Sequence, residues 1–406
     1  MAGHRLRFDS HGRLAAWTPW RRALDLEMRF YRRCPSEHGY PRFVYATFLD
    51  ADWRPSAERT DTIPATQNGM GILSYLKFHD WDGRREPAYL DTARAMGEYL
   101  VRETLTPPEG RYPRFTRSTG NRDRLPLAPD CGSQSDRPHE IEPDKGGIAG
   151  YALARLYEAT GEGRFLAQAL HNASVLAAHQ QPGDGAHSPW PFRVDYRTGE
   201  GRGPVSGNMT YVLRLYEALL AHGHRQFAAP RDALWRWMRR WQIPSAAGDG
   251  ALFAQFFEDH DTPDNRTAWA PLNLARHLLE SREALDPDWL AMAGLLVDFV
   301  RRTFTHREFG VTVCHEQDED PNAWGGINST YGAVLALYAR ARGDRAAAAE
   351  AREALNFTLY SIDAEGRPRD LHKTAAPIGW QEDAHTDVIH NYVDALNAFP
   401  EWADAP

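Results

Sequence analysis

Carboxyl groups that could work in pairs stand at two places in this chain, each directly before an apolar segment with helical spacing. Glu142 and Asp144 occupy a proline-bounded turn in PHEIEPDKGG, and Glu382 and Asp383 follow a tryptophan in GWQEDAHTD. Hydrolysis of a glycosidic bond needs one carboxyl group as proton donor and a second as base or nucleophile. We therefore predict that these four groups include the catalytic pair of a glycoside hydrolase. The competing interpretation is solvated charges or charges that balance a helix N-terminus.

A third acidic cluster, EDHD at residues 258–261, is rich in oxygen ligands that would suit a cation. A solvated acidic loop is the simpler interpretation of the same residues. Nothing else in the sequence requires a metal ion or an organic cofactor, so neither is predicted. The distance between paired carboxyl groups, which separates retention from inversion of the sugar, cannot be obtained from a sequence.

A histidine near the C-terminal end offers a different chemistry. Asp387, His390 and Asn391 fall at positions i, i+3 and i+4 of one predicted helix and therefore share a face. A histidine with an orienting acid can act as a general base, and Tyr211 and Tyr331 stand at equivalent helix starts as candidate acids. Such a set would abstract the proton beside a uronate carboxylate and eliminate the linked sugar, which is the reaction of a polysaccharide lyase.

Two further sets complete this second chemistry. The groups that could neutralise the uronate carboxylate are Asn68, Asn208, Asn328, Arg193 and Arg266. The histidines that would suit a sugar epimerase, by moving a proton between them, are His315, His385 and His390. A buried structural role is the alternative for each of these histidines.

Aromatic rings interleaved with polar groups mark the segments before the predicted helices. Such mixtures suit sugars, whose apolar faces stack on rings while their hydroxyls form hydrogen bonds. Tryptophans that only pack loops onto helix ends are the competing interpretation. The predicted substrate-binding residues are Asn68, His139, Lys145, Trp190, Arg193, Asn208, Arg266, His315, Trp324, Asn328, Trp380, His385 and Asp387.

An Asn-x-Thr triplet recurs in three of these segments, at residues 208–210, 265–267 and 328–330. The triplet predicts that Thr210, Thr267 and Thr330 are N-caps, which accept hydrogen bonds from free backbone N–H groups at a helix start. The asparagine two residues earlier is not needed for the cap. We expect it to face the substrate.

The elements that position these groups form a repeat of about 60 residues. Each unit is an apolar helix, a short turn and a second amphipathic helix, as in residues 146–180, and a long polar stretch leads to the next unit. The predicted pairs are 67–105, 146–180, 208–242, 267–304 and 328–362. The last helix, 386–399, lacks a second member, and the unpaired amphipathic helix 19–33 supplies it.

This pattern of period, orphan terminal helices and tryptophan-rich loops resembles the (α/α)6-toroid carbohydrate-active enzymes, the six-hairpin glycosidases. The resemblance implies an all-α ring of six inner and six outer helices. It would form one domain over residues 1–406, with helix 19–33 closing the ring and the repeated pairs within residues 67–402. In such toroids the N-termini of the inner helices and the loops before them form the catalytic face.

Composition excludes several classes of function. The net charge of −8 argues against non-specific nucleic-acid binding, which needs a basic face. The three cysteines, Cys34, Cys131 and Cys314, lack the spacing of a zinc site or a disulfide framework. No window approaches about 18 apolar residues and no signal-peptide core is evident, so a cytoplasmic protein that does not enter membranes is expected. The oligomeric state is open.

These observations predict a carbohydrate-active enzyme with an oligosaccharide as substrate, and a sugar acid is one candidate component. A hydrolase is the first interpretation, and a lyase or an epimerase of the same fold is the second. A non-enzymatic toroid that binds a glycan or a protein is the third. The concentration of polar residues before all six predicted inner helices disfavours it, since a binding protein would scatter them around the rim.

Overall fold

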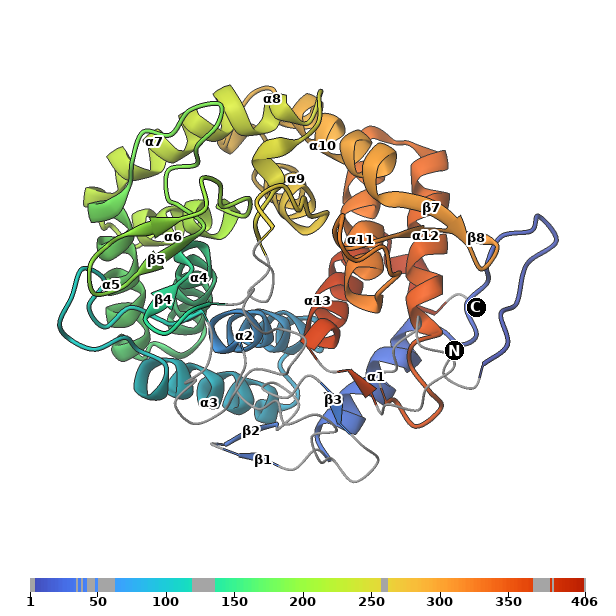
Figure 1. Ribbon diagram of the computed structural model, residues 1–406. Helices are drawn as coiled ribbons and strands as arrows, with labels where there is room; N and C mark the ends of the chain where they lie inside the picture. The colour runs from blue at the N-terminus through green and yellow to red at the C-terminus, as the bar shows by residue number, and fades with distance from the viewer. Residues whose placement is uncertain are drawn as a thin grey trace.

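The computed structural model describes residues 4–33, 36–37, 39–41, 48–49, 63–118, 136–256, 262–367, 380–381 and 383–404. Six helices of the described chain form an inner ring (Figure 1). They are α2 (Pro64–Trp81), α4 (Pro143–Thr160), α6 (Thr210–Ala221), α9 (Trp269–Ser281), α11 (Gly325–Arg342) and α13 (Asp383–Ala398). Each packs against the next in this order, and α13 packs against α2, so the ring is closed.

An outer helix covers each inner one (Figure 1). The outer helices are α1 (Trp20–Tyr31), α3 (Pro87–Glu103), α5 (Gly163–His179), α7 (Ala228–Trp237), α10 (Trp289–Phe304) and α12 (Arg345–Leu359). Helix α7 continues through a π-helical turn at Met238–Gln242 into the short α8 (Ile243–Ser245). The predicted all-α toroid is confirmed. Every inner helix begins within three residues of its predicted start, and α1 takes the predicted closing position against α13.

Local signals explain where several helices begin and end. Proline occupies the first turn of α2, α3 and α4, where its missing N–H group costs nothing. Gly161 and Gly343 follow α4 and α11 in the left-handed conformation that only glycine adopts easily. The Asp344 side chain accepts hydrogen bonds from the N–H groups of Ala346 and Ala347 and so caps α12.

Close packing between α4 and α6 fixes the start of α4. A Cβ atom placed on Gly147 would lie 2.9 Å from the backbone nitrogen of Val212, and one on Gly146 would lie 2.0 Å from the ring of Phe115. The two glycines therefore let α4 approach the neighbouring helix and the chain beneath it. This contact holds the residues at the N-terminal end of α4 at a fixed depth in the ring.

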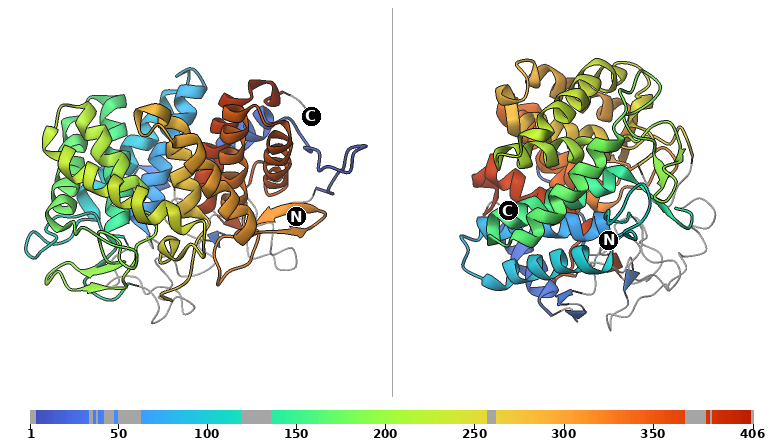
Figure 2. Two further views of the ribbon diagram at one scale, coloured as in Figure 1. Left: turned by 90° about the horizontal axis from the view of Figure 1, so that it is seen from above. Right: turned by 90° about the vertical axis from the view of Figure 1, so that its left-hand side faces the viewer.

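The strands are short and lie together with the long loops at one end of the ring (Figure 2). Two hairpins are β1 (Ser36–Glu37) with β2 (Tyr40–Pro41) and β7 (Thr305–Glu308) with β8 (Val311–Cys314), and β3 (Phe48–Leu49) pairs with β9 (Trp380–Gln381). A three-stranded antiparallel sheet contains β4 (Glu140–Ile141), β5 (Arg193–Asp195) and β6 (Gly201–Arg202).

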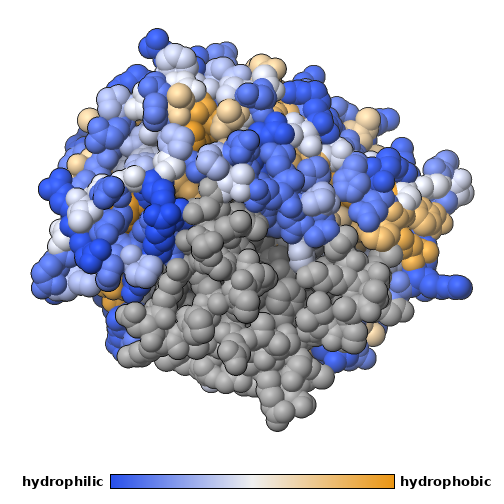
Figure 3. Space-filling model, in the orientation of Figure 1, coloured by the Kyte–Doolittle hydropathy of each residue, from blue (hydrophilic) through white to orange (hydrophobic). Residues whose placement is uncertain are grey.

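Hydrophilic residues dominate the described part of the surface that Figure 3 presents. Among the described residues, Phe8 and Trp241 are the large apolar side chains that stay exposed. A search of the same residues for a helix of sufficient length and apolarity to span a bilayer finds none.

Candidate functional site

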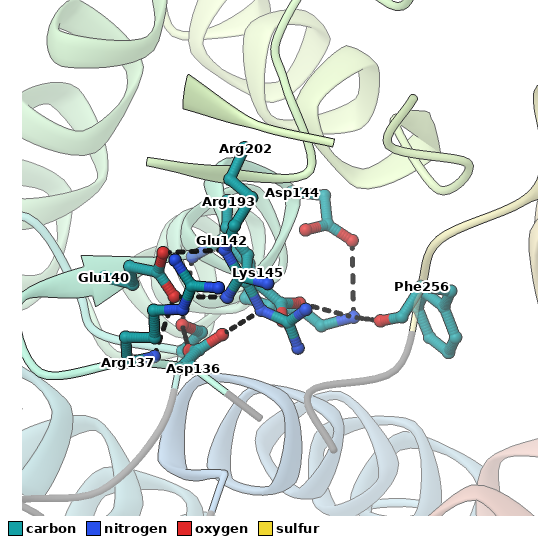
Figure 4. Close-up of polar contacts among 10 residues, drawn as sticks. Asp136, Arg137, Glu140, Glu142, Asp144, Lys145, Arg193, Arg202 and Phe256 are labelled. Atoms are coloured by element: carbon teal, nitrogen blue, oxygen red, sulfur yellow. Dashed lines mark hydrogen bonds and ion pairs between the residues drawn. The ribbon is translucent and has the colours of Figure 1, made fainter. Parts of the chain in front are cut away.

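Glu142 and Asp144 lie where strand β4 leads into helix α4. Glu142 is the residue before the first helical turn, Pro143 opens the helix, and Asp144 follows in that turn. Both carboxyl side chains have no exposed surface. The interpretation of these acids as solvated loop charges is therefore wrong, because they belong to a buried network of charged groups (Figure 4).

The ammonium group of Lys145 connects the two carboxyl groups. Its Nζ atom lies 3.3 Å from Oδ2 of Asp144 and 3.5 Å from Oε2 of Glu142. The same group donates a hydrogen bond to the carbonyl of Phe256 and lies 3.6 Å from the centre of that residue's ring. Lys145 is itself fully buried, so its charge is balanced inside the protein.

A second cation reaches Glu142 from strand β5. Arg193 donates from Nε to Oδ1 of Asp136 at 2.6 Å, and its terminal nitrogen lies 3.3 Å from Oε1 of Glu142. The Ser118 hydroxyl donates to Asp136 at 2.6 Å and accepts from the backbone N–H of Glu142 at 3.0 Å. The pairing of β4 with β5 brings Arg193 to the start of α4, although the two are far apart in the sequence.

The two acidic groups of α4 differ in electrostatic environment. Burial raises the pKa of the Asp144 carboxyl, and the nearby Lys145 ammonium opposes this increase only in part. Glu142 contacts two cations, Lys145 and Arg193, and its carboxyl group also contacts that of Asp136. Burial also acts to raise the pKa of Asp136, but Arg193 and Ser118 outweigh it and the pKa is lowered. Two neighbouring carboxyl groups with unlike environments are suited to be an acid and a base.

Buried polar atoms without a hydrogen-bond partner gather at the starts of three neighbouring inner helices. Oδ1 of Asp144 on α4 is one of them. In the described part of the chain the others are both amide atoms of Gln67, Oδ1 of Asn68, the Ser206 hydroxyl and both amide atoms of Asn208. Each of these side chains is at most 2% exposed. Because burying a polar group without a partner is costly, such atoms indicate a site for a polar ligand.

The sequence analysis missed several members of this site. Asp136 and Ser118 hold Arg193 and the backbone before α4, and Phe256 supplies the carbonyl that Lys145 contacts. Gln67 and Ser206 were not among the predicted binding residues. No local pattern distinguishes Asp136, Ser118 and Phe256, because their partners come from distant segments.

Several predicted residues instead hold the scaffold. The Asn328 side chain bonds the backbone N–H and carbonyl of Cys314 and so ties β8 to α11. The Trp190 indole is fully buried and donates to the Leu176 carbonyl at 3.1 Å. Tyr331 donates to Glu350 on the outer helix α12, which directs its hydroxyl away from the centre of the ring.

Four more predicted binding residues lie in the loops. His139 has a φ of +73° and shares a 2.8 Å hydrogen bond with the Tyr196 hydroxyl. Arg266 forms a partly exposed ion pair with Asp318 at 2.7 Å, and Trp324 donates to Asp320 at 2.8 Å.

The fourth loop residue, His315, packs against the rings of Phe304 and His306. Burial and the neighbouring His306 lower its pKa. None of these contacts connects His315 to the carboxyl groups of α4.

The threonines of the Asn-x-Thr triplets do not behave alike. Thr267 accepts a hydrogen bond from the Trp269 N–H at the start of α9, as expected of a capping side chain. Thr210 is the first residue of α6 and makes no cap. Thr330 lies inside α11, which begins at Gly325, and donates to the Gly326 carbonyl, so its prediction as an N-cap is wrong.

The remaining predicted residues belong to the last unit. Glu382 and the EDHD cluster at 258–261 lie outside the described residues. Asp383, His385 and Asp387 lie in the first turns of α13 and Trp380 in β9, where the backbone alone is described. Among the described residues, no group of histidine, cysteine, aspartate and glutamate side chains could hold a metal ion.

His390 and Tyr211 line a cavity of about 840 Å³. Nε2 of His390 lies 3.3 Å from Nζ of Lys77, whose ammonium group lies 2.5 Å from Oδ1 of Asp394. Burial lowers the pKa of His390 well below its ordinary value, and the cations Lys77, Arg276 and Arg214 lower it further, so the imidazole is neutral.

Comparison with solved structures identifies the architecture. The cellobiose 2-epimerase from Spirochaeta thermophila matches with a TM-score of 0.66 and 16% identity, over 94% of this chain and 96% of that chain. The fold is that of the six-hairpin toroids. A D-mannose isomerase matches with a TM-score of 0.64 and 12% identity, over 93% of this chain and 96% of that chain. A family 76 α-mannanase from Bacteroides thetaiotaomicron matches with a TM-score of 0.62 and 13% identity, over 93% and 95%.

Identities this low establish a common fold and no more. No protein-family model matches the sequence, and a comparison with curated protein sequences finds no match.

Proposed function

We propose that the protein is a carbohydrate-active enzyme that hydrolyses a glycosidic bond of an oligosaccharide, with Glu142 and Asp144 as its carboxyl pair. The observation that carries this proposal is that both carboxyl groups contact the buried ammonium group of Lys145 but differ in electrostatic environment. They lie at the starts of the inner helices, where several buried polar atoms lack hydrogen-bond partners in the part of the chain that the structure describes. A carbohydrate substrate is supported by structural neighbours that are named as a cellobiose epimerase, a mannose isomerase and a mannanase.

In this mechanism Asp144 is the proton donor. Its raised pKa favours the protonated carboxyl, and Oδ1 has no partner in the described structure and can face the glycosidic oxygen. Glu142, which contacts Lys145 and Arg193, is the partner that activates water or attacks the sugar carbon. Gln67, Asn68 and Asn208 would bind hydroxyls. Because all these groups are buried, the substrate reaches them only when the protein opens over the site.

A sugar epimerase is the second candidate function. The observation that favours it is the position of His390 beside a cavity, since epimerisation needs a group that exchanges protons with a bound sugar. The lyase variant of this chemistry has less support, because its second candidate acid, Tyr331, bonds to an outer helix. Only Tyr211 shares the cavity with His390.

The test is incubation of the purified protein with a panel of neutral and uronate-containing oligosaccharides. Reducing-end release, ultraviolet absorbance of an unsaturated uronate and epimer composition are followed together. Hydrolysis predicts reducing ends alone, and these disappear in Glu142→Gln and Asp144→Asn. Glu140→Gln is the matched control, because Glu140 lies in the same segment but pairs with Arg202 at 2.8 Å outside the proposed pair. New ultraviolet absorbance or a changed epimer ratio would reject hydrolysis.

A further inference from the structure

The cavity beside His390 opens at the opposite end of the ring from the carboxyl pair. Its wall comes from α2, from the middle and end of α4 and α13, from the end of α9, and from the first turns of α3 and α6. Glu158 on α4 lines it, and Asp144 lies at the other end of that helix. At about 1.5 Å per residue, these two positions are about 21 Å apart along the axis. The rim of the cavity is therefore distant from the site proposed for catalysis, whereas its inner end reaches Tyr211 in the first turn of α6.

The cavity runs from buried residues to solvent. Lys77, Tyr211 and His390 lie at its inner part, where His390 is 6% exposed. Arg155 and Asp80 on the rim are exposed. A volume of about 840 Å³ falls within the range of small-molecule sites, about 300–1,000 Å³.

At the inner end of the cavity, the Nδ1 atom of His390 is buried and lacks a hydrogen-bond acceptor among the described residues. The Lys77 ammonium can only donate, so Nε2 of His390 accepts its hydrogen bond at 3.3 Å. A neutral imidazole with Nε2 as acceptor carries its proton on Nδ1. Nδ1 is buried and has no hydrogen-bond partner in the described structure. An oxygen of a ligand would satisfy it.

The walls combine aromatic rings with cations that are already paired. The rings of Tyr151 and Tyr211 lie 6.0 Å apart, and Trp81 adds a third aromatic side chain. Arg214 donates to the Tyr151 hydroxyl at 3.1 Å and pairs with Glu280 at 2.6 Å.

The other cations of the wall have carboxylate partners too. These pairs are Lys77 with Asp394, Arg84 with Asp80, and Arg155 with Glu158. An anionic ligand would have to displace one of these carboxylates, whereas a neutral ligand with many hydroxyls can bond to both members of each pair.

We propose that this cavity is a second ligand site, which binds a neutral sugar of one or two rings at the end of the toroid opposite Glu142 and Asp144. The aromatic rings would stack on the apolar face of the sugar. The paired charges would bond its hydroxyls, and Nδ1–H of His390 would donate to the oxygen that reaches deepest. This proposal does not rest on the hydrolytic function.

The experiment is calorimetric titration of the full chain with D-glucose, D-mannose and cellobiose, and with D-glucuronate and inorganic phosphate as charged probes. Ala159→Trp would fill the mouth of the cavity from an exposed position on α4. Ala346→Trp, on an exposed position of the outer helix α12, is the matched control. His390→Gln can still accept from Lys77 but lacks a donor at the Nδ1 position.

We expect at least one neutral sugar to bind. Its affinity should fall about tenfold or more in Ala159→Trp and in His390→Gln, and should be unchanged in Ala346→Trp and in the double variant Glu142→Gln/Asp144→Asn. No binding of any neutral sugar, stronger binding of glucuronate or phosphate, or unchanged affinity in Ala159→Trp would overturn the proposal. Loss of binding in the double variant alone would assign the sugar to the α4 site, and loss of all catalysis in Ala159→Trp would make the cavity the active site.

Discussion

Lys145 and Asp144 are adjacent in sequence, and their side chains form an ion pair of 3.3 Å that has no exposed surface. Neighbours on a helix normally point in different directions, so this contact depends on the turn that starts α4 and on the carbonyl of Phe256, which draws the ammonium group toward it. The pair gives the proposed proton donor a nearby positive charge without removing its raised pKa.

Removing either carboxyl group should abolish most of the activity. We expect Glu142→Gln and Asp144→Asn each to lower kcat by a factor of about 10²–10⁴ on an oligosaccharide that the native protein cleaves. The rate of the native protein should fall as the pH rises through the raised pKa of Asp144, because the donor loses its proton. Initial rates across a pH series test both statements, and Glu140→Gln should keep the native profile.

Replacement of Lys145 should destabilise the fold. Lys145→Met leaves two buried carboxyl groups with one fewer cation, and breaking a buried ion pair costs about 3–5 kcal/mol of unfolding free energy. Denaturant unfolding measures this loss. Arg102→Met removes an exposed pair with Glu98 and should change the stability little. Similar effects of the two variants would contradict the buried network.

The close approach of α4 to α6 should make one glycine sensitive to a single methyl group. Gly147→Ala puts a Cβ atom 2.9 Å from a backbone nitrogen that cannot rotate away, and we expect a loss of about 1–3 kcal/mol. Gly163→Ala, in the first turn of α5, meets no atom within 4 Å and should be neutral or stabilising. Thermal unfolding of both variants compares them under the same conditions.

The stability of the fold should depend on the pH through His390. Its native pKa is lowered by burial and by Lys77, Arg276 and Arg214, so below about pH 6.5 the unfolded chain binds a proton that the native chain does not. The free energy of unfolding is therefore not reduced by His390 above that pH, and it declines as the pH falls toward the native pKa of His390. The slope for one proton is at most about 1.4 kcal/mol per pH unit.

His390→Gln should reduce this slope between pH 6.5 and pH 5.5, as measured by denaturant unfolding at each pH. Asp394, whose Oδ2 lies 3.6 Å from Nε2, stays in the variant. An identical slope in both proteins would show that His390 is protonated in the native state.

The helical ring could be predicted from the sequence because its signals are local. The spacing of apolar residues within each helix, the prolines before α2 and α4, and the glycines after α4 and α11 each act within a few residues. A local signal also led to the wrong prediction for Thr330, because the Asn-x-Thr triplet resembles a capping pattern but lies inside the helix. Helix α11 begins at Gly325, six residues before the helix start that an N-cap at Thr330 implies.

The site depended on contacts that no local pattern contains. Arg193 reaches Glu142 because β5 pairs with β4, and Asn328 is used up by Cys314 because β8 folds back against α11. His390 could be singled out from its place on the face of one predicted helix, but its neighbours Lys77 and Asp394 could not. Lys77 and Asp394 meet there from the two helices that close the ring.

The closure by α1 joins segments that lie far apart in the sequence. Trp20 on α1 packs against Tyr392 on α13 and Trp402 beyond it, and Arg21 pairs with Asp404 at 2.9 Å. Contacts between segments so far apart in sequence form slowly. During synthesis on the ribosome, α1 can pack against α13 only after α13 has been synthesised. A nascent chain that lacks α13 would therefore form an open ring with an exposed apolar face. Chaperones would bind this face until α13 is synthesised.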